Sequence, residues 1–150
     1  MAGNTVCATY ARDLQNAIHD HGVGQHVFKL MLYTSLSGLN ADLAWTTSTN
    51  EVVGAGYVAN GATLTNVAPS LSGKTGFSQW EDITFSGADF STVGGVIYNS
   101  TPKGVVAAGP WPTVMVLDFG KTVTRSGTDL VVRMPTADAL NALVRVRVEE

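Results

Sequence analysis

From residue 26 onward, the sequence alternates between short apolar or threonine-rich segments and clusters of Gly, Pro, Asn and Ser. Such segments are typical of β-strands, and such clusters are typical of turns. The expected strands are HVFKLMLYT (26–34), TLTNVAP (63–69), TGFSQWEDITF (75–85), TVGGVIYN (92–99), TVMVLDF (113–119), DLVVRMP (129–135) and ALVRVRV (142–148). In the first of them, Phe28, Leu30 and Leu32 are expected on one face. The expected turns are Gly73–Lys74, Ser86–Gly87, residues 99–104, Gly109–Pro110, Ser126–Gly127 and Pro135. This pattern predicts a mainly β fold, an antiparallel β-sandwich of jelly-roll-like type or a barrel.

The first part of the chain has the spacing of an α-helix instead. Between Thr5 and His21, apolar side chains recur every three or four residues, at Val6, Tyr10, Leu14, Ala17 and Ile18. Asn4 or Thr5 would cap this helix, and Gly22 and Gly24 would end it. We therefore predict one domain over residues 1–150, with an N-terminal helix within 1–22 and a β-sandwich over 26–148. A single helical turn is expected at TADALN (136–141).

Composition argues against several classes of function. Only 14% of the residues are charged and the net charge is −3, so we expect no nucleic-acid partner, because such partners select basic surfaces. No apolar stretch approaches the roughly 18 residues of a membrane span, and the N-terminus lacks the pattern of a signal peptide. A single cysteine, Cys7, excludes an internal disulfide. These features predict a soluble protein that is made in a reducing cytoplasm.

Three glycines, Gly54, Gly56 and Gly61, lie between two apolar runs in NEVVGAGYVANGATL (50–64). A dinucleotide-binding loop has the spacing G-x-G-x-x-G and leads into a helix, whose N-terminus binds the phosphates. Here the third glycine comes two positions later, and a β-rich segment follows. The glycines are therefore predicted to permit bulges and tight bends between strands.

Histidines form the one group that resembles a metal site: His19, His21 and His26, with Asp13 nearby in sequence. On a helix, side chains at positions i and i+2 point to different faces, so this spacing disfavours a shared metal ion. A cationic histidine near a helix C-terminus is the alternative interpretation.

Other residues that could carry chemistry lack their usual partners. VLDFG (116–120) contains the Asp-Phe-Gly of protein kinases, but the chain has no catalytic H-R-D loop, so Asp118 is interpreted as a strand end. Cys7 lies beside the apolar stripe, and no serine lies in G-x-S-x-G. The carboxylate pairs Glu81–Asp82 and Glu149–Glu150 are typical of solvated turns and termini. We therefore predict no catalytic, cofactor or metal site.

Two stretches are candidate contact surfaces for a partner. Gly109-Pro110-Trp111-Pro112 holds an aromatic ring in a stiff loop, with Trp111 as an anchor and Pro110 and Pro112 beside it. The alternative is that Trp111 closes one end of the core. In the last strand, Arg145 and Arg147 alternate with valines, which predicts a half-buried strand with a basic outer face. This face would pair with acidic groups of a neighbour or simply be solvated.

Several collinear motifs resemble a family of small virion proteins of tailed bacteriophages. The resemblance covers the chain from residue 7 to about residue 146. It departs from the family's pattern in an insert at 102–112 and in the histidine-rich start HGVGQHVF (21–28). The motifs are FKLMLYTSLSGLNADLAWTTSTNEVVGAGYVANGATLTNV (28–67), GGVIYNST (94–101), VMVLDFG (114–120) and MPTADALNALVRV (134–146).

The resemblance implies a virion component without enzymatic activity. Within this class we expect a head decoration (cement) protein on the capsid exterior, made in the host cytoplasm, that binds the major capsid protein and associates as a dimer or trimer. Low charge suits a protein that adds a modest interface at many copies. The alternatives are a tail or neck component that binds a host surface through Trp45 or Trp111, and a small glycan hydrolase with His19, His21 and Glu51.

Overall fold

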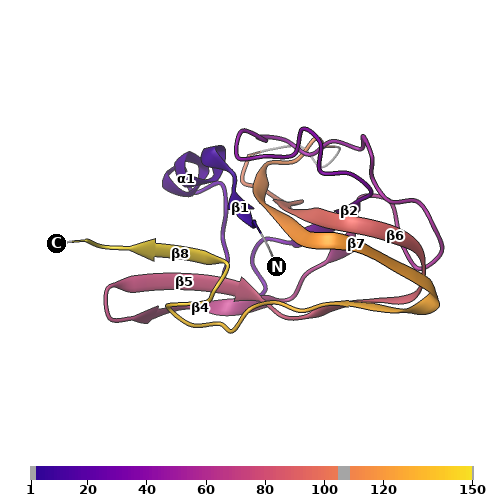
Figure 1. Ribbon diagram of the computed structural model, residues 1–150. Coiled ribbons are helices and arrows are strands. Elements are labelled where there is room, and N and C mark those ends of the chain that lie inside the picture. The colour runs from indigo at the N-terminus through magenta and orange to yellow at the C-terminus, as the bar shows by residue number, and fades with distance from the viewer. Residues whose placement is uncertain (1–2, 105–108, 150) are drawn as a thin grey trace.

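The chain folds into two antiparallel β-sheets and one short helix (Figure 1). In the computed structural model, residues 3–104 and 109–149 are described. The larger sheet has the strand order β1-β7-β6-β2-β3, and the smaller sheet has the order β4-β5-β8. The predicted class, a mainly β antiparallel sandwich with one N-terminal helix, is confirmed. The elements are β1 (Thr5–Val6), α1 (Ala8–Gln15), β2 (Phe28–Tyr33), β3 (Ala62–Thr63), β4 (Asn66–Ser72), β5 (Thr75–Trp80), β6 (Ile83–Asn99), β7 (Thr113–Val132) and β8 (Val144–Arg147).

Residues 1–2, 105–108 and 150 lie outside the described part of the chain. With them lie the start of the predicted 1–22 segment, the middle of the 102–112 insert and the second of the paired C-terminal glutamates.

Strands β6 and β7 form one long antiparallel ribbon that contributes to both layers. Their pairing runs from Ile83 with Val132 to Tyr98 with Thr113, and it contains several register shifts. In Figure 1 the ribbon turns back at the right, so that one part lies beside β2 and the other runs beneath it towards β4. Extra residues in one strand of a pair bend and twist the ribbon, which explains how a single hairpin reaches both layers.

Two predicted turns and one predicted strand end fall inside this ribbon. Gly87 and Gly127 have φ values of +60° and +68°, as a turn would require. They lie instead at bulges within continuous strands, near register shifts of β6 against β7. The predicted turns at Ser86–Gly87 and Ser126–Gly127 were therefore wrong, because a glycine with positive φ serves a bulge as well as a turn. Asp118 also lies within β7, paired with Gly94, and not at a strand end.

Strand β2 is buried on both of its faces. Leu30 and Leu32 pack into the main core between the layers, as the sequence predicts for this face. Met31 and Tyr33 point the other way, into a second core that Leu36, Leu39 and Leu43 of the following loop help to cover. Full burial of one such side chain stabilises the fold by about 1.5–3 kcal/mol, so β2 is a central source of stability.

Helix α1 is shorter than the apolar spacing predicts. The residues before it, Thr5 and Val6, form strand β1 and pair with Val116 and Met115 at the edge of β7. The N-cap is Cys7, without a side-chain cap, so the predicted caps at Asn4 and Thr5 were wrong. Strand β1 thus covers the edge of β7 at Met115 and Val116.

The C-terminal end of α1 is set by a residue in the left-handed conformation. Ala17 has φ +54°, and its N–H donates to the carbonyl of Leu14 (3.1 Å). The N–H of Ile18 donates to the carbonyl of Asp13 (2.9 Å). These two bonds form a Schellman motif, which ends the helix. The predicted stops at Gly22 and Gly24 were therefore wrong, and residues 18–27 run as a loop.

The glycine-rich stretch packs directly against the backbone of the sheet. A Cβ atom on Gly61 would lie 2.1 Å from the carbonyl oxygen of Leu30, and one on Gly54 would lie 2.5 Å from that of Asp89. Gly56 and Gly61 also have φ values of +79° and +75°. Only glycine allows this close approach and this conformation. The predicted role of these glycines in tight bends is confirmed.

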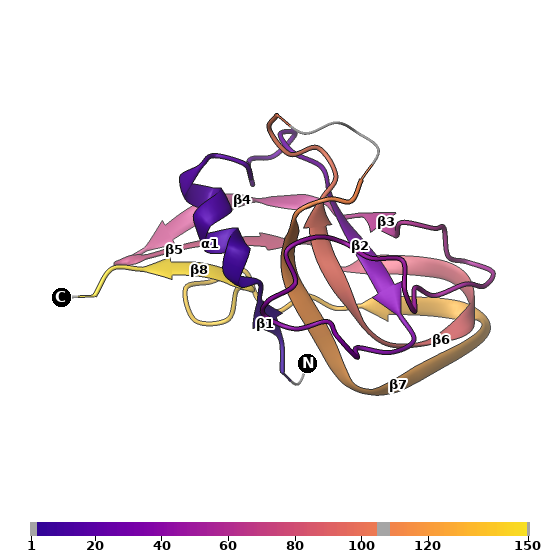
Figure 2. The same ribbon diagram turned by 90° about the horizontal axis from the view of Figure 1, so that it is seen from above.

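The smaller sheet projects from the body as a three-stranded arm, here the residues of β4, β5 and β8 (Figures 1 and 2). The predicted turn at Gly73–Lys74 joins β4 to β5. In β8, Val144 is buried, but Val146 is 60% exposed, and Val148 just beyond it is 65% exposed. The prediction of a half-buried final strand was therefore wrong for the outer half of β8. That half lies in the projecting arm, where the valines are exposed.

A single turn leads into β8, as predicted for residues 136–141. The N–H of Ala142 donates to the carbonyl of Asp138 (3.1 Å). The carboxylate of Asp138 accepts from the N–H groups of Leu140 and Asn141. This side chain thus caps the turn in the way that an aspartate caps a helix.

Candidate functional site

A groove of about 540 Å³ lies between helix α1 and the arm. Its volume falls within the roughly 300–1,000 Å³ of small-ligand sites. Tyr10 and the histidines of the 18–27 loop line one side, and Val144 and Val146 of β8 line the other. It brings together His19, His21 and His26, so it is the candidate site.

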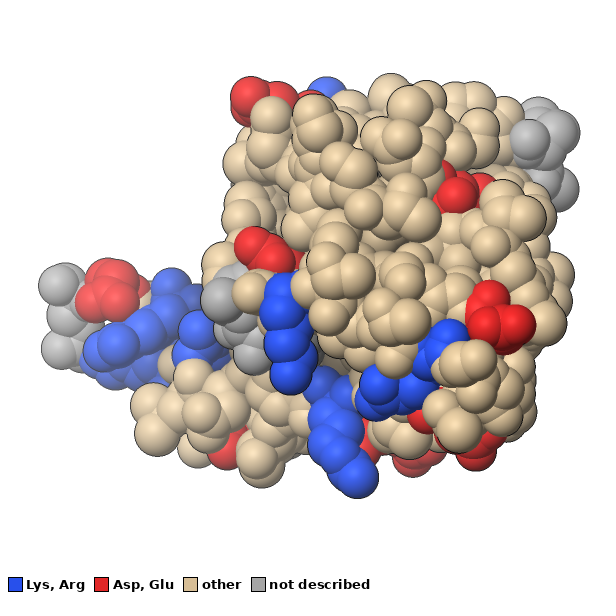
Figure 3. All heavy atoms as spheres, turned by 45° about the vertical axis from the view of Figure 1, so that its right-hand side comes forward, with Lys and Arg blue, Asp and Glu red and all other residues tan. Residues whose placement is uncertain are grey.

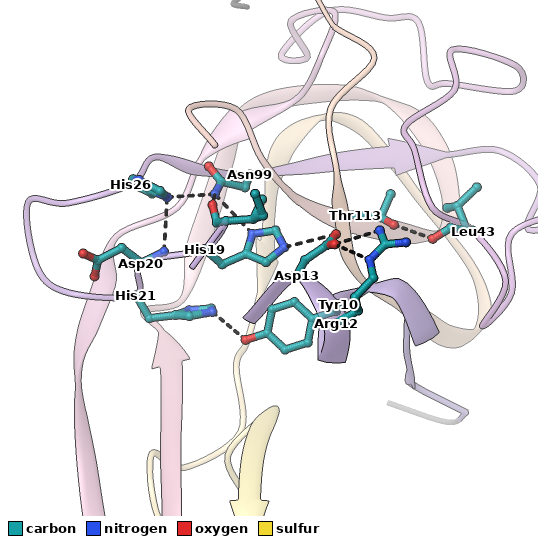
Figure 4. Close-up of polar contacts among 11 residues, drawn as sticks. Tyr10, Arg12, Asp13, His19, Asp20, His21, His26, Leu43, Asn99 and Thr113 are labelled. Carbon is teal, nitrogen blue, oxygen red and sulfur yellow. Dashed lines mark hydrogen bonds and ion pairs between the residues drawn. The ribbon is translucent and has the colours of Figure 1, made fainter. Parts of the chain in front are cut away.

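Asn99 at the end of β6 fixes two of the histidines (Figure 4). Its side-chain nitrogen lies 3.2 Å from Nδ1 of His19 and 3.0 Å from Nδ1 of His26. Its oxygen accepts from the N–H of Thr101 (2.9 Å), which sets the orientation of the amide. The N–H of Asp20 also donates to Nδ1 of His26 (3.1 Å). The side-chain nitrogen of Asn99 also lies 3.2 Å from the carbonyl oxygen of Ile18. Because the amide nitrogen and the backbone N–H only donate, each Nδ1 is the acceptor in these contacts.

His21 is held by Tyr10 and by two aromatic rings. The hydroxyl oxygen of Tyr10 lies 2.6 Å from Nε2 of His21. The imidazole stacks on Phe28, with ring centroids 4.5 Å apart, and contacts Trp80 at 5.5 Å. Burial raises the pKa of Tyr10 well above its ordinary value, so the hydroxyl keeps its proton and shares one hydrogen bond with Nε2. Nδ1 of His21 is buried without a hydrogen-bond partner.

Burial keeps two of the histidines neutral at pH 7. It lowers the pKa of His19 to about 4, partly opposed by the nearby carboxylate of Asp13. It also lowers the pKa of His21 to about 4, with a further contribution from His19. The expectation of a cationic histidine near the helix end was therefore wrong. The helix ends before these residues, and the loop carries them into the protein.

Asp13 is a buried carboxylate beside the same cluster, with 6% of its surface exposed. One of its oxygens accepts from Nη2 of Arg12 (2.8 Å), whose side chain is 65% exposed. The other lies 3.9 Å from Nε2 of His19, too far for a hydrogen bond. Nε2 of His19 therefore has no hydrogen-bond partner.

These contacts make the cluster a structural clamp for the 18–27 loop. The bonds tie the loop to α1 through Tyr10 and to β6 through Asn99. Within residues 3–104 and 109–149, no group of three or more His, Cys, Asp or Glu side chains is placed to hold a metal ion. Cys7 is fully buried, and burial raises the pKa of its thiol, which disfavours the reactive thiolate.

Glu51 lies in a different part of the molecule from these histidines. Its carboxylate accepts from the hydroxyl of Tyr57 (2.8 Å) and from the N–H of Asn60 (2.6 Å), in the glycine-rich stretch. It does not line the groove that holds His19 and His21. The structure therefore does not bring together the three residues considered for a glycan hydrolase.

Trp111, the predicted anchor, is half-buried and packs on the second core. Its ring stacks on Tyr98, with centroids 5.2 Å apart. Its backbone N–H donates to the hydroxyl oxygen of Thr46 (3.0 Å), and its indole Nε1 is buried without a hydrogen-bond partner. Pro112 is buried and pairs with Trp45, whereas Pro110 is exposed. Of the two interpretations of Trp111, these contacts favour the one in which it closes the core. Trp45, 48% exposed, presents more of its ring to a partner.

Arg145 and Arg147 lie on the arm, in exposed positions. Each pairs across the strand with a residue of β5, Phe77 and Thr75 respectively. Figure 3 shows Lys and Arg side chains gathered on the projecting arm, at its left. The basic face predicted from the sequence is therefore present. Just after β8, the carboxylate of Glu149 lies 3.1 Å from the guanidinium of Arg147.

Sequence reasoning found the histidines but missed the residues that organise them. Tyr10 was assigned to an apolar stripe, and Asn99 was assigned to a turn. Asn99 lies 73 positions from His26 and 80 from His19, so no local spacing could join them. The available signal was a polar asparagine that ends an otherwise apolar strand, GGVIYN.

Comparison with known proteins gives no relative: no family model, curated protein sequence or solved structure matches this chain. Within the described residues, the one helix is too short to cross a bilayer.

Proposed function

We propose that this chain is a non-enzymatic structural protein of a tailed-phage virion, and that it decorates the outside of the head by binding the major capsid protein. Two things support the proposal. One is the collinear resemblance of its sequence motifs to small virion proteins. The other, which carries the structural argument, is a rigid loop that presents apolar side chains to the outside.

That loop is the glycine-rich stretch that begins at residue 50. Val53 is 91% exposed and Val58 is 75% exposed. Between and around them, Glu51 binds Tyr57 and Asn60, and the glycines lie against the backbone of β2 and β6. The loop is thus ordered by its own contacts and does not need a partner to order it.

A preordered apolar loop suits a protein that binds a repeated surface. Association then loses little conformational entropy, because the loop is already fixed. Each contact can be modest, since a lattice of many copies adds many such contacts to one shell. Two exposed valines of this kind on a chain with 14% charged residues fit such a lattice contact.

The second candidate is a tail or neck component that binds a host surface. The observation that favours it is Trp45, which is 48% exposed and fixed beside Pro112 by a β-bridge. Exposed, rigid aromatic rings are common anchors in recognition.

Replacing both exposed valines tests the role of the loop. The variant Val53→Asp/Val58→Asp is expected to fold normally, because both side chains face water, and to be incorporated into heads at least tenfold less than the wild type. The measurement is the amount of this protein bound to purified heads of the phage grown without its gene.

The matched control is Val23→Asp, at another exposed valine (64%) outside this loop, which is expected to bind as the wild type does. Equal incorporation of the double variant and the wild type would refute the loop as the shell contact. A wild type that does not bind heads but binds host cells, with that binding lost on Trp45→Ala, would instead favour the tail or host-binding function.

A further inference from the structure

One face of the arm carries a row of exposed aliphatic side chains. Leu71 pairs with Gly76, and Gly76 pairs with Val146, so these residues stand on the same face of the sheet. Val148 is two positions beyond Val146 and lies on that face as well. The exposed fractions are 72% for Leu71, 60% for Val146 and 65% for Val148. A three-stranded sheet with such a face is usually covered by another layer.

The same face contains a hollow at its centre. A Cβ atom on Gly76 would meet a single neighbouring atom, the carbonyl oxygen of Val146, at 3.9 Å. The space above Gly76 is therefore open, and it is flanked by Leu71 and Val146. It continues into the groove beside α1, which Gly76 and Val146 also line. The face thus carries projections and a hollow next to each other.

The charges of the arm lie on its opposite face. Arg145 and Arg147 alternate with the valines along β8, and their cross-strand neighbours are Phe77 and Thr75. They line a separate hollow with Leu140 on that side. Two arms that meet through the apolar face therefore keep their arginines apart.

We propose that two copies of the chain form a dimer by packing these arm faces against each other. A twofold axis lets Leu71 of each copy enter the hollow above Gly76 of the other. Such an interface is isologous and closes with two copies. A second copy is the occupant that this surface fits, because the projections and the hollow that receives them lie on the same face.

The size of the face sets the expected affinity. Three strands about 4.8 Å apart and roughly six residues long, at about 3.3 Å each, give a face of roughly 14 by 20 Å. Two such flat faces total roughly 560 Å²; side-chain relief and the adjoining wall of the groove raise the buried area towards about 1,000 Å², the size of a weak interface. A dissociation constant of roughly 1–100 μM is therefore expected.

Sedimentation equilibrium of the full chain, from 1 to 200 μM, tests the proposal. The wild type is expected to dimerise in this range. Val146→Asp would place a charge in the contact, and Gly76→Val would fill the hollow; each is expected to raise the dissociation constant at least tenfold. Both changes are compatible with the folded monomer, since Val146 is exposed and the space at Gly76 is open. Thermal unfolding of each variant checks this.

Val53→Asp, on the loop proposed to bind the shell, is the control and is expected to dimerise as the wild type does. A wild type that is monomeric at 200 μM would overturn the proposal, and so would dimers that neither arm variant weakens. The dimer does not rest on the virion function. A protein that dimerises but does not bind heads would contradict only the virion function. A protein that binds heads but stays monomeric would contradict only the dimer.

Discussion

At pH 4 the protein is expected to be several kcal/mol less stable against unfolding than at pH 7, because His19 and His21 are buried as neutral rings. Their pKa in the folded protein is about 4, against an ordinary value of 6.5. Between these values the unfolded chain binds a proton at each histidine and the folded chain does not. The free energy of unfolding therefore falls as the pH falls through this window.

The size of the effect follows from the same shift. One pKa unit corresponds to about 1.36 kcal/mol, so each histidine contributes at most roughly 3 kcal/mol. This stability is fully present above pH 6.5 and is lost as the pH falls towards 4. The geometry gives the cause. Both rings are buried, so the charge of an added proton would be removed from water. At His19 the added proton would also face the amide nitrogen of Asn99, which only donates.

Urea unfolding at several pH values between 4 and 7 measures this dependence. In the double variant Tyr10→Phe/His21→Phe both partners of one bond are replaced by rings of similar shape. It is expected to lose about half of the decrease, because it keeps only His19 of the pair. Tyr10→Phe alone keeps both histidines and is expected to retain the full decrease. Equal stability at pH 4 and pH 7, or an unchanged decrease in the double variant, would contradict the buried neutral state.

Gly61→Ala is expected to lower the free energy of unfolding by more than about 4 kcal/mol, among the largest losses for a single methyl group. The added Cβ would lie 2.1 Å from the carbonyl oxygen of Leu30, in the middle of the buried strand β2. The backbone of Gly61 is also left-handed, at φ +75°. The contact is with backbone, so no side-chain rotation relieves it.

Gly38→Ala is the matched control for this prediction. Gly38 is also left-handed, at φ +81°, but its added Cβ would have no atom within 4 Å. It is expected to lose only the conformational cost of roughly 1–2 kcal/mol. Urea unfolding of both variants separates the two causes. Equal losses would show that conformation alone requires glycine at residue 61.

Local sequence patterns predicted those features of the fold that depend on local geometry. The alternation in FKLMLY gave strand β2 and its core-facing leucines, and Gly73–Lys74 gave a hairpin. The glycines of 54–61 were assigned to tight bends on spacing alone. Ser86–Gly87 and Ser126–Gly127 were mistaken for turns, because a bulge needs the same glycine conformation as a turn. Only the long-range pairing of β6 with β7 distinguishes the two.

The candidate site was less predictable, because distant parts of the chain build it. The helix ends at Gln15, and Ala17 just beyond it is left-handed, which is rare for alanine. The sequence pattern therefore placed His19 and His21 on a helix that stops before them. Their partners come from α1 and from Asn99 at the end of β6. The outer half of β8 has the alternation of a half-buried strand. Its valines are nevertheless exposed, because this part of the strand lies in the projecting arm.

Copy number per particle tests the proposed virion function most directly. Heads and tails of the phage that encodes this chain are separated, and the protein is quantified against the major capsid protein in each fraction. A head decoration protein is expected on heads in a fixed, lattice-wide ratio to the capsid subunit. Its presence only with tails, at a few copies per particle, would contradict head decoration, and its absence from both fractions would contradict any structural role in the virion.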